Sequence, residues 1–287
     1  MALSMTGYGK SEGIFDEKKI TVELRTLNSK QLDLNIKVPG IYRSLETAIR
    51  TELLPLQRGK VDVFVMTENL QACPTSTINE DLFKSYHVQL KKLAVELDSP
   101  NASFDAILRL PEVIGVEKAE VTEEEQAAVL SCMKQSLEQL TQFRKQEGEV
   151  IMADILDRVN KIEKLLTQVE PFEKERIEAT KSKMQQALND AVGAAQIDKN
   201  RFEQEMVYFL EKLDVTEEKT RLRNHCTYFI ETSKEDNSGK KLGFIAQEMG
   251  REINTLGSKA NNSSMQQIVV QMKDELEKIK EQLLNVL

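Results

Sequence analysis

Tryptophan is absent from this chain of 287 residues, and aromatic side chains make up only 5% of it. The three cysteines, Cys73, Cys132 and Cys226, lie far apart and form no Cys-x-x-Cys pair. An odd, sparse set of cysteines argues against a disulfide framework or a zinc–thiolate site and fits a reducing compartment. The composition therefore predicts a cytoplasmic protein that is stabilised by packing rather than by cross-links.

Long apolar runs are also missing. No stretch approaches the roughly 20 apolar residues needed to cross a bilayer, so we expect no membrane partner. Residues 1–10 lack a basic flank followed by an apolar run, so we expect no secretory signal there. The chain contains no zincin motif, Walker loop, Rossmann fingerprint or nucleophile elbow. No signature of those enzyme classes therefore competes with the residues considered below.

Positive charge is in the minority, because 39 Lys and Arg stand against 47 Asp and Glu, a net charge of −8. Taken alone, this net charge counts against a nucleic-acid partner, which needs a positive face. The acidity is uneven, however. Residues 112–149 hold nine acidic and four basic side chains, a net of −5, whereas residues 1–70 hold nine acidic and ten basic ones, a net of +1. A basic face on the first 70 residues is compatible with the acidic total.

Alternation of apolar and polar residues dominates the first 70 positions. Ile20, Val22 and Leu24 alternate with polar residues, and residues 32–38 repeat the pattern, so each run has one face to bury. Helical spacing over residues 41–55 and a further apolar run at 61–66 complete a β-β-α-β unit. We predict an α+β fold that begins with a small N-terminal β-sheet domain carrying a helix.

From about residue 78 the spacing becomes helical. Residues 122–125 have the form of a capping box, in which Thr122 accepts a bond from the backbone N–H of Glu125 and Glu125 reaches back. A long helical tract follows to about residue 190, and Pro171 should kink it or begin a second helix. The residues after 200 have helical spacing throughout. The pattern predicts a long helical middle and an all-α C-terminal domain.

The last helix carries apolar residues in alternating steps of four and three, which form a heptad seam: Met265, Val269, Met272, Leu276, Ile279, Leu283 and Val286. Such a seam fits a core helix that packs on its own domain. It also fits a contact in an oligomer, together with the long helices of residues 122–190. The spacing leaves both interpretations open.

A first set of polar residues with helical spacing contains one of only two histidines. Glu218, Arg221 and His225 fall on one face of a helix, and Asp214 joins this row unless Thr216 caps a restarted helix. His225 is able to transfer a proton near neutral pH. The alternative is a solvated face with salt bridges, which is common on helices.

A second set lies in residues 240–259. Leu242, Ile245, Met249, Ile253 and Leu256 form the stripe that should be buried, and Glu248, Glu252, Thr255 and Lys259 lie directly beside it. A partly buried carboxylate needs a basic partner or a metal ion. A carboxylate-rich site suits Mg²⁺ or Mn²⁺, and nearby Arg and Lys would hold a phosphate. We predict that Glu248 and Glu252 face the row of His225 and help to bind a divalent ion.

Several motifs resemble the YicC/YloC-like endoribonuclease family. At the N-terminal end these are residues 4–9 (SMTGYG), 23–28 (ELRTLN), 32–34 and 58–60 (RGK), and at the C-terminal end residues 213–218 (LDVTEE), 221–225 (RLRNH) and 247–259 (QEMGREINTLGSK). Ser29, Lys30 and Gly243 depart from the expected pattern. At position 30 lysine keeps the charge of the usual arginine but loses its bidentate fork.

This resemblance implies a metal-dependent endoribonuclease that acts on RNA as a ring-like homo-oligomer, a hexamer. We expect an N-terminal RNA-binding domain at 1–120, a long helical connecting region at 121–195 and a C-terminal helical catalytic domain at 196–287. The expected acids and metal ligands are Glu218, Glu248 and Glu252, with His225 as proton carrier or ligand. Phosphate would be held by Arg221, Arg251 and Lys259, and the RNA backbone also by Arg25, Lys30, Arg58 and Lys60.

Two other functions fit the same residues. One is a non-catalytic RNA-binding or adaptor protein that delivers RNA to another nuclease. The other is a helical scaffold, for which charge and heptads alone would suffice. Cleavage by the purified protein separates an enzyme from an adaptor, and RNA binding separates an adaptor from a scaffold.

Overall fold

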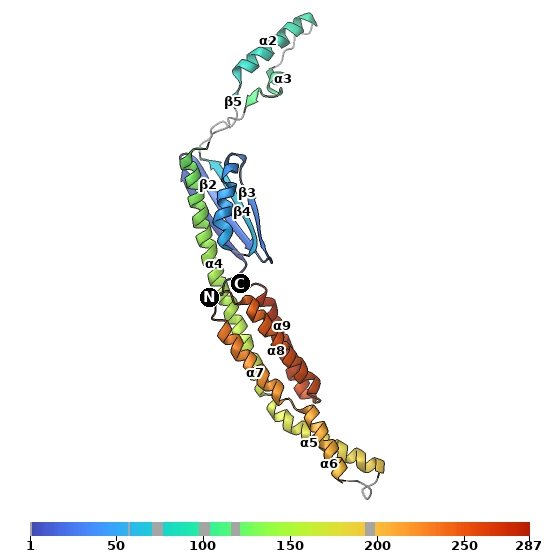
Figure 1. The fold of residues 1–287 in the computed structure, drawn as a ribbon. Helices are drawn as coiled ribbons and strands as arrows, with labels where there is room; N and C mark the ends of the chain where they lie inside the picture. Colours follow the sequence, from blue (N-terminus) through green and yellow to red (C-terminus); the bar gives the residue numbers. More distant parts are fainter. Residues whose placement is uncertain (1, 57, 71–76, 98–103, 116–120, 193–198) are drawn as a thin grey trace.

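The computed structural model describes residues 2–56, 58–70, 77–97, 104–115, 121–192 and 199–287. It has the predicted α+β fold, with a four-stranded sheet near the N-terminus and helices over most of the remainder (Figure 1). The strands of this sheet are β1 (Gly7–Phe15), β2 (Lys18–Leu27), β3 (Leu32–Lys37) and β4 (Gly59–Asn69). Two short strands, β5 (Thr77–Ile78) and β6 (Ile114–Gly115), pair with each other elsewhere.

The sheet has the strand order β1-β2-β4-β3, in which only β3 and β4 run parallel. The parallel pair is joined through a 3-10 turn (Gly40–Leu45), α1 (Glu46–Leu53) and a second 3-10 turn (Leu54–Leu56). The alternating apolar residues of β2 and β4 are buried on one face, against α1 and the first half of α4 (Glu123–Thr167). The predicted alternation is therefore confirmed, and the other face of the sheet carries the polar residues.

Strand β1 was not predicted, because its sequence lacks an apolar face. Its inward positions are small, and α4 lies directly on them. A Cβ atom on Gly9 would come within 2.1 Å of the carbonyl oxygen of Ser136, and one on Gly7 within 2.8 Å of Leu140 Cδ1. The hydroxyl of Ser11 donates to the carbonyl oxygen of Cys132 at 2.6 Å. Strand and helix are thus held by close backbone approach rather than by large side chains.

The predicted start of α4 is confirmed in part. The Thr122 hydroxyl accepts a bond from the backbone N–H of Glu125 at 3.2 Å. The carboxylate of Glu125 does not reach back, because it is buried and bonded to Lys18 at 2.9 Å and to the Tyr42 hydroxyl at 2.5 Å. The helical tract breaks before Pro171, which is the second residue of α5 (Glu170–Val192), where its missing N–H costs nothing.

The C-terminal half of α4 continues past the sheet into a bundle with α7 (Thr216–Thr232), α8 (Gly239–Lys259) and α9 (Ser263–Leu283) (Figure 1). The whole heptad seam of residues 265–286 is buried in this bundle, against α4 and α8. The seam therefore belongs to the chain's own core. Of the two interpretations of the seam, the core helix is confirmed and the oligomer contact is wrong for these side chains, because each is already at least nine-tenths buried within one chain.

Two helical extensions project from the ends of the molecule (Figure 1). Beyond the sheet lie α2 (Glu80–Glu96) and α3 (Phe104–Leu108), and α2 is capped by Asn79, whose side chain accepts from the Leu82 N–H at 3.1 Å. At the other end α5 and α6 (Lys199–Leu213) extend past the bundle. No helix in the described ranges is long and apolar enough to cross a membrane.

The two chain ends join the sheet to the bundle. The Met5 N–H donates to the carbonyl oxygen of Asn285 at 2.9 Å, and the Leu287 N–H donates to that of Leu3 at 2.9 Å. Both ends therefore lie at the middle of the molecule (Figure 1). The division expected at residues 120 and 195 remains a prediction, since these boundaries lie outside the described residues. Helix α4 crosses from one core to the other without a break.

Candidate nuclease site on α7 and α8

The candidate site lies on two neighbouring helices that run antiparallel. Leu222, Cys226 and Phe229 of α7 pack against the predicted stripe of α8, all of which is buried. Burial of these stripes leaves one rim of α8 facing α7, and this rim carries Glu248, Glu252, Thr255 and Lys259, all half-buried. The pattern of apolar residues thus places both predicted rows of polar side chains along the seam between the two helices.

Glu218 and Lys259 meet across this seam. The Lys259 ammonium donates to Glu218 Oε1 at 2.7 Å and to the carbonyl oxygen of Asp214 at 3.1 Å. The Glu218 side chain is only 7% exposed, and its second oxygen, Oε2, is buried with no hydrogen-bond partner among the described residues. A buried carboxylate oxygen without a partner is costly, so this atom is available to a further cation or donor.

Arg221 and Glu252 form the next pair along the seam. Arg221 Nη1 lies 4.0 Å from Glu252 Oε1, which is the outer limit of an ion pair, and Arg221 also pairs with Glu217 on its own helix. The Glu252 side chain is 12% exposed while Arg221 is 57% exposed. Glu252 is therefore a largely buried carboxylate whose one ion pair with a described residue is loose.

The remaining predicted residues of the two helices are less tightly placed. Glu248 lies on the same rim but is 43% exposed and pairs with Arg251 of its own helix at 3.0 Å. His225 is half-buried one turn after Arg221 on α7. Asp214 precedes α7 and accepts bonds from the Thr216 amide and hydroxyl, which lower the pKa of this carboxyl. Thr216 is the first residue of α7, so Asp214 does not belong to the row.

Two residues that the sequence analysis did not select hold this site in place from α5. Arg176 is buried and donates to the carbonyl oxygens of Lys259, at 2.6 Å, and Leu213, so it joins the ends of α8 and α6. Glu173 pairs with Lys219 of α7 at 2.8 Å. An arginine on the last carbonyls of a helix is favourable. Nothing in the local spacing of α5 indicates these contacts, because their partners lie 37 to 84 residues later in the chain.

The donor atoms suit a hard divalent cation in part. Glu218 and Glu252 are the two best-buried carboxylates of the seam, and Glu218 Oε2 lacks a partner. Mg²⁺ is commonly held by one or two carboxylates, with water and substrate phosphate completing its shell. Within the described ranges, however, no group of three or more His, Cys, Asp or Glu side chains is placed to hold an ion. A cation at this seam would therefore depend on phosphate or water for most of its ligands.

The predicted basic residues of the sheet do not join this seam. Arg25 is exposed on the open face, paired with Glu23 at 2.7 Å and 5.9 Å from the ring centroids of both Tyr8 and Phe64. Lys30 and Lys60 are exposed near the first residues of β3 and β4, at the end of the sheet where the Asn28 amide donates to the carbonyl oxygen of Leu284. Arg58 donates through Nε to the carbonyl oxygen of Ser29 at 2.8 Å. The sheet and the acidic seam are separated by much of the length of α8.

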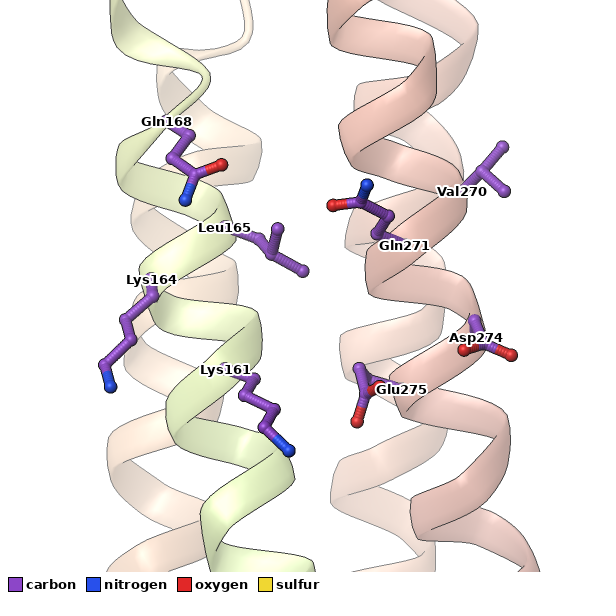
Figure 2. Close-up of a pocket in the computed structure, with 8 residues that line it drawn as sticks. All are labelled: Lys161, Lys164, Leu165, Gln168, Val270, Gln271, Asp274 and Glu275. Carbon is purple, nitrogen blue, oxygen red and sulfur yellow. The ribbon is translucent and has the colours of Figure 1, made fainter.

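A groove of about 580 Å³ lies between α4 and α9 (Figure 2). Lysines line the α4 wall and acids the α9 wall, and Leu165 of α4 points across toward α9 (Figure 2). Its two lysines and two acids balance, and three of these four side chains are paired locally: Lys161 with Asp157, Glu275 with Arg158 and Asp274 with Lys278, at 2.8, 3.1 and 2.6 Å. This groove has no excess of charge for a polyanion.

Comparison with known proteins matches the whole chain to one kind of protein. Residues 3–153 match the N-terminal region of YicC-like endoribonucleases, and residues 169–287 match the C-terminal part described under the same name. A Clostridioides difficile protein named probable endoribonuclease YicC is 30% identical over 292 aligned residues, with all of both chains covered. A Haemophilus influenzae protein of the same name is 27% identical, again with both chains covered in full.

Proposed function

The chain belongs to the YicC-like endoribonuclease family, and from this membership we propose that it hydrolyses phosphodiester bonds of RNA at the seam between α7 and α8 with a divalent cation. The observation that carries the placement is the meeting of two largely buried carboxylates, Glu218 and Glu252, with Lys259 and Arg221 across the seam. Negative groups suit a cation and positive groups suit a phosphate, and a nuclease needs both within one site.

The residues of the seam would share the chemistry as follows. Glu218, Glu252 and, more loosely, Glu248 would hold Mg²⁺ or Mn²⁺, which when bound supplies charge neutralisation and a more acidic water. Lys259, Arg221 and Arg251 would hold phosphate oxygens. His225 is the only histidine near the seam and would carry a proton to or from the reacting oxygens. The half-buried setting keeps these charges partly desolvated, which strengthens their interaction with substrate.

The basic residues of the sheet would extend RNA binding beyond the bond that is cut. They all lie within residues 1–70, whose net charge is +1 in a chain of net charge −8: Arg25, Lys30, Arg58 and Lys60. Phosphate contacts of this kind add affinity without sequence preference. We also propose a ring-like homo-oligomer, a hexamer, since both helical extensions carry exposed apolar side chains that a single chain leaves uncovered.

The test uses Glu252→Gln in the full-length protein. Cleavage of a single-stranded RNA in Mn²⁺ should fall by about 100-fold, while RNA affinity in EDTA stays nearly the same, because a neutral amide is a poor ligand for the cation. Mn²⁺ should raise the melting temperature of the wild type but not of Glu252→Gln. Glu231→Gln, an exposed acid on α7, is the matched control and should behave like the wild type in both assays.

A structural role for Glu252 gives a different result. If the pair with Arg221 serves only the fold, Glu252→Gln should melt at a lower temperature and Mn²⁺ should leave the wild type unchanged. Full cleavage by Glu252→Gln would remove this residue from the mechanism. RNA binding without any cleavage by the wild type would favour the adaptor function instead.

A further inference from the structure

A second groove, of about 370 Å³, lies where the sheet meets the helical bundle, beside the two chain ends. The aliphatic residues that line it come mainly from the end of the chain: Leu283, Leu284 and Val286, with Met5. Its walls combine an aromatic ring, an amide and three basic side chains: Phe244, Gln247, Arg58, Lys240 and Lys280. None of the described residues that line this junction groove is acidic. In a chain with a net charge of −8 such a concentration of positive charge is unusual.

The three basic side chains of the groove differ in the hydrogen bonds and ion pairs that they already form. Lys280 is paired with Glu277 at 2.8 Å, and toward the described residues the Arg58 side chain donates only through its Nε, to the carbonyl oxygen of Ser29. The Lys240 ammonium has no hydrogen bond or ion pair with any residue that the structure describes. Lys240 and the terminal nitrogens of Arg58 are therefore available for an anion, and they come from positions 182 residues apart (240 − 58).

The groove also presents a flat apolar surface. The Phe244 side chain is 58% exposed, although it belongs to a helix with a large buried stripe on another face. Apart from its chain neighbours and the backbone of its own helix, no described atom lies within 4 Å of the position of a Cβ on the neighbouring Gly243, so there is open space here. An exposed ring beside free cations matches the chemistry of a nucleotide, since a base stacks on the ring and a phosphate binds the cations.

We propose that the junction groove holds one nucleotide of a single-stranded RNA, with its base on Phe244 and its phosphate between Lys240 and Arg58. This assignment rests on the proposed function, because RNA is the substrate of that function. Single-stranded RNA is favoured over a duplex, since only an unpaired, unstacked base can present its face to a side chain.

The groove and the acidic seam lie along the same helix. Lys240, Phe244, Gln247 and Arg251 follow one another at spacings of four, three and four, so they form one outer row of α8, and Glu252 is adjacent to the end of that row. Twelve residues separate Lys240 from Glu252, a rise of about 18 Å. A strand held in the groove would thus run along α8 toward the seam, and the groove would bind the RNA away from the bond that is cut.

The experiment measures binding of a fluorescein-labelled single-stranded RNA by anisotropy, in EDTA so that the strand stays intact. The variants of the full chain are Lys240→Gln, Phe244→Leu and Phe244→Tyr, with Lys273→Gln, an exposed lysine of α9, as the charge control. Each protein is titrated at several salt concentrations, against the same RNA and against an abasic strand of equal length. Free AMP is added as a competitor in a separate arm.

Phe244→Leu should weaken binding of the intact RNA roughly 5- to 150-fold, whereas Phe244→Tyr should bind it like the wild type. On the abasic strand Phe244→Leu and the wild type should bind equally well. Lys240→Gln should lower the slope of log affinity against log salt by about 0.7, the amount for one phosphate of a single strand. Lys273→Gln should leave the slope unchanged. Equal affinity and salt slope in all variants would overturn the proposal. It would also be overturned if free AMP displaced the RNA at concentrations as low as the dissociation constant of the strand, because the groove would then be a site for a free nucleotide.

The two proposals fail in different ways. If the groove variants bind and cleave like the wild type while Glu252→Gln loses cleavage, only the groove is wrong. If the groove variants lose affinity as expected but the wild type does not cleave, the groove stands and the nuclease assignment of the seam fails.

Discussion

Two glutamates in different cores, Glu125 and Glu218, are almost fully buried, and each is paired with one lysine. Glu125 also accepts a hydrogen bond from Tyr42, and neither of its oxygens is left buried without a partner. Glu218 has one bonded oxygen and one buried oxygen without a partner. Glu125 therefore serves the stability of the fold, whereas Oε2 of Glu218 is left able to accept a bond from a ligand.

Glu125 should make stability depend on pH in the acid range. Burial raises its pKa, but hydrogen bonds from Tyr42 and Lys18 outweigh this, so the pKa lies below its usual value. A carboxyl with a lowered pKa stabilises the fold above its unfolded pKa of about 4.3 and loses that effect as the pH falls through the folded value. Glu125→Gln should therefore lower the free energy of unfolding by about 1 to 3 kcal/mol at neutral pH, and by less in acid.

Urea unfolding of the wild type and Glu125→Gln, at neutral pH and below about pH 4, measures this difference. Glu124→Gln is the control, because Glu124 is the exposed neighbour in the same turn of α4. A loss of stability that is the same at both pH values would show that the packing of Glu125, and not its charge, matters.

At the scale of elements, glycines decide how closely helices and strands approach. Gly7 and Gly9 let α4 lie on β1, where a side chain would meet Arg144, Leu140 or the backbone of α4. In α8 the positions differ: a Cβ on Gly257 would lie 2.9 Å from Val269 Cγ1 of α9, whereas one on Gly243 would meet nothing within 4 Å. The same residue type in one helix thus serves packing at one end and leaves a groove open at the other.

Alanine at these two positions should have opposite effects. Gly243→Ala should raise the free energy of unfolding by about 0.5 to 1 kcal/mol, because alanine is the better helix former and its methyl group has room. Gly257→Ala should lower it by about 1 to 3 kcal/mol, because the branched side chain of Val269 cannot turn aside without repacking α9. Thermal melting of both variants, followed by circular dichroism, tests this; a loss of stability in Gly243→Ala would contradict it.

At the scale of the whole molecule, the extensions carry the strongest indication of assembly. Helix α2 has no buried side chain, and its described ring contacts are those of Phe83 and His87 with Phe104 of the short α3. A helix of 17 residues with so little packing is marginal in water. Val88 and Val95 are one heptad apart on the same face of α2 and are 67% and 79% exposed. At the other end Val207, Tyr208 and Phe209 of α6 are exposed. Contacts between copies of the chain at these places would cover the apolar surface.

Light scattering at micromolar concentration should therefore give a mass several times the 32.7 kDa of one chain. Val88→Glu should reduce that mass, because a buried unpaired carboxylate weakens an apolar contact. Gln89→Glu adds the same charge at the next exposed position of α2 and should assemble like the wild type. A monomeric wild type would count decisively against the ring-like oligomer.

Local spacing determined much of this protein. The alternation in β2 and β4, the caps at Asn79 and Thr122 and the buried stripe of α8 all follow from the order of residues, because periods of two and 3.6 dictate which side chains share a face. The same periodicity placed Glu252 and Lys259 beside the stripe and Glu218 in a row with Arg221. Family motifs then connected these rows to RNA cleavage.

Tertiary structure alone decided which of these rows meet. The pairing of Glu218 with Lys259, the support from Arg176 and the burial of the heptad seam inside one chain all depend on how distant helices pack. The junction groove joins Arg58 to Lys240 and Phe244 only because the chain ends bring the sheet against the bundle. Periodicity fixes which side chains share a face of each element. Contacts between elements far apart in sequence depend on the packing of the whole chain, and a short sequence pattern carries no information about that packing.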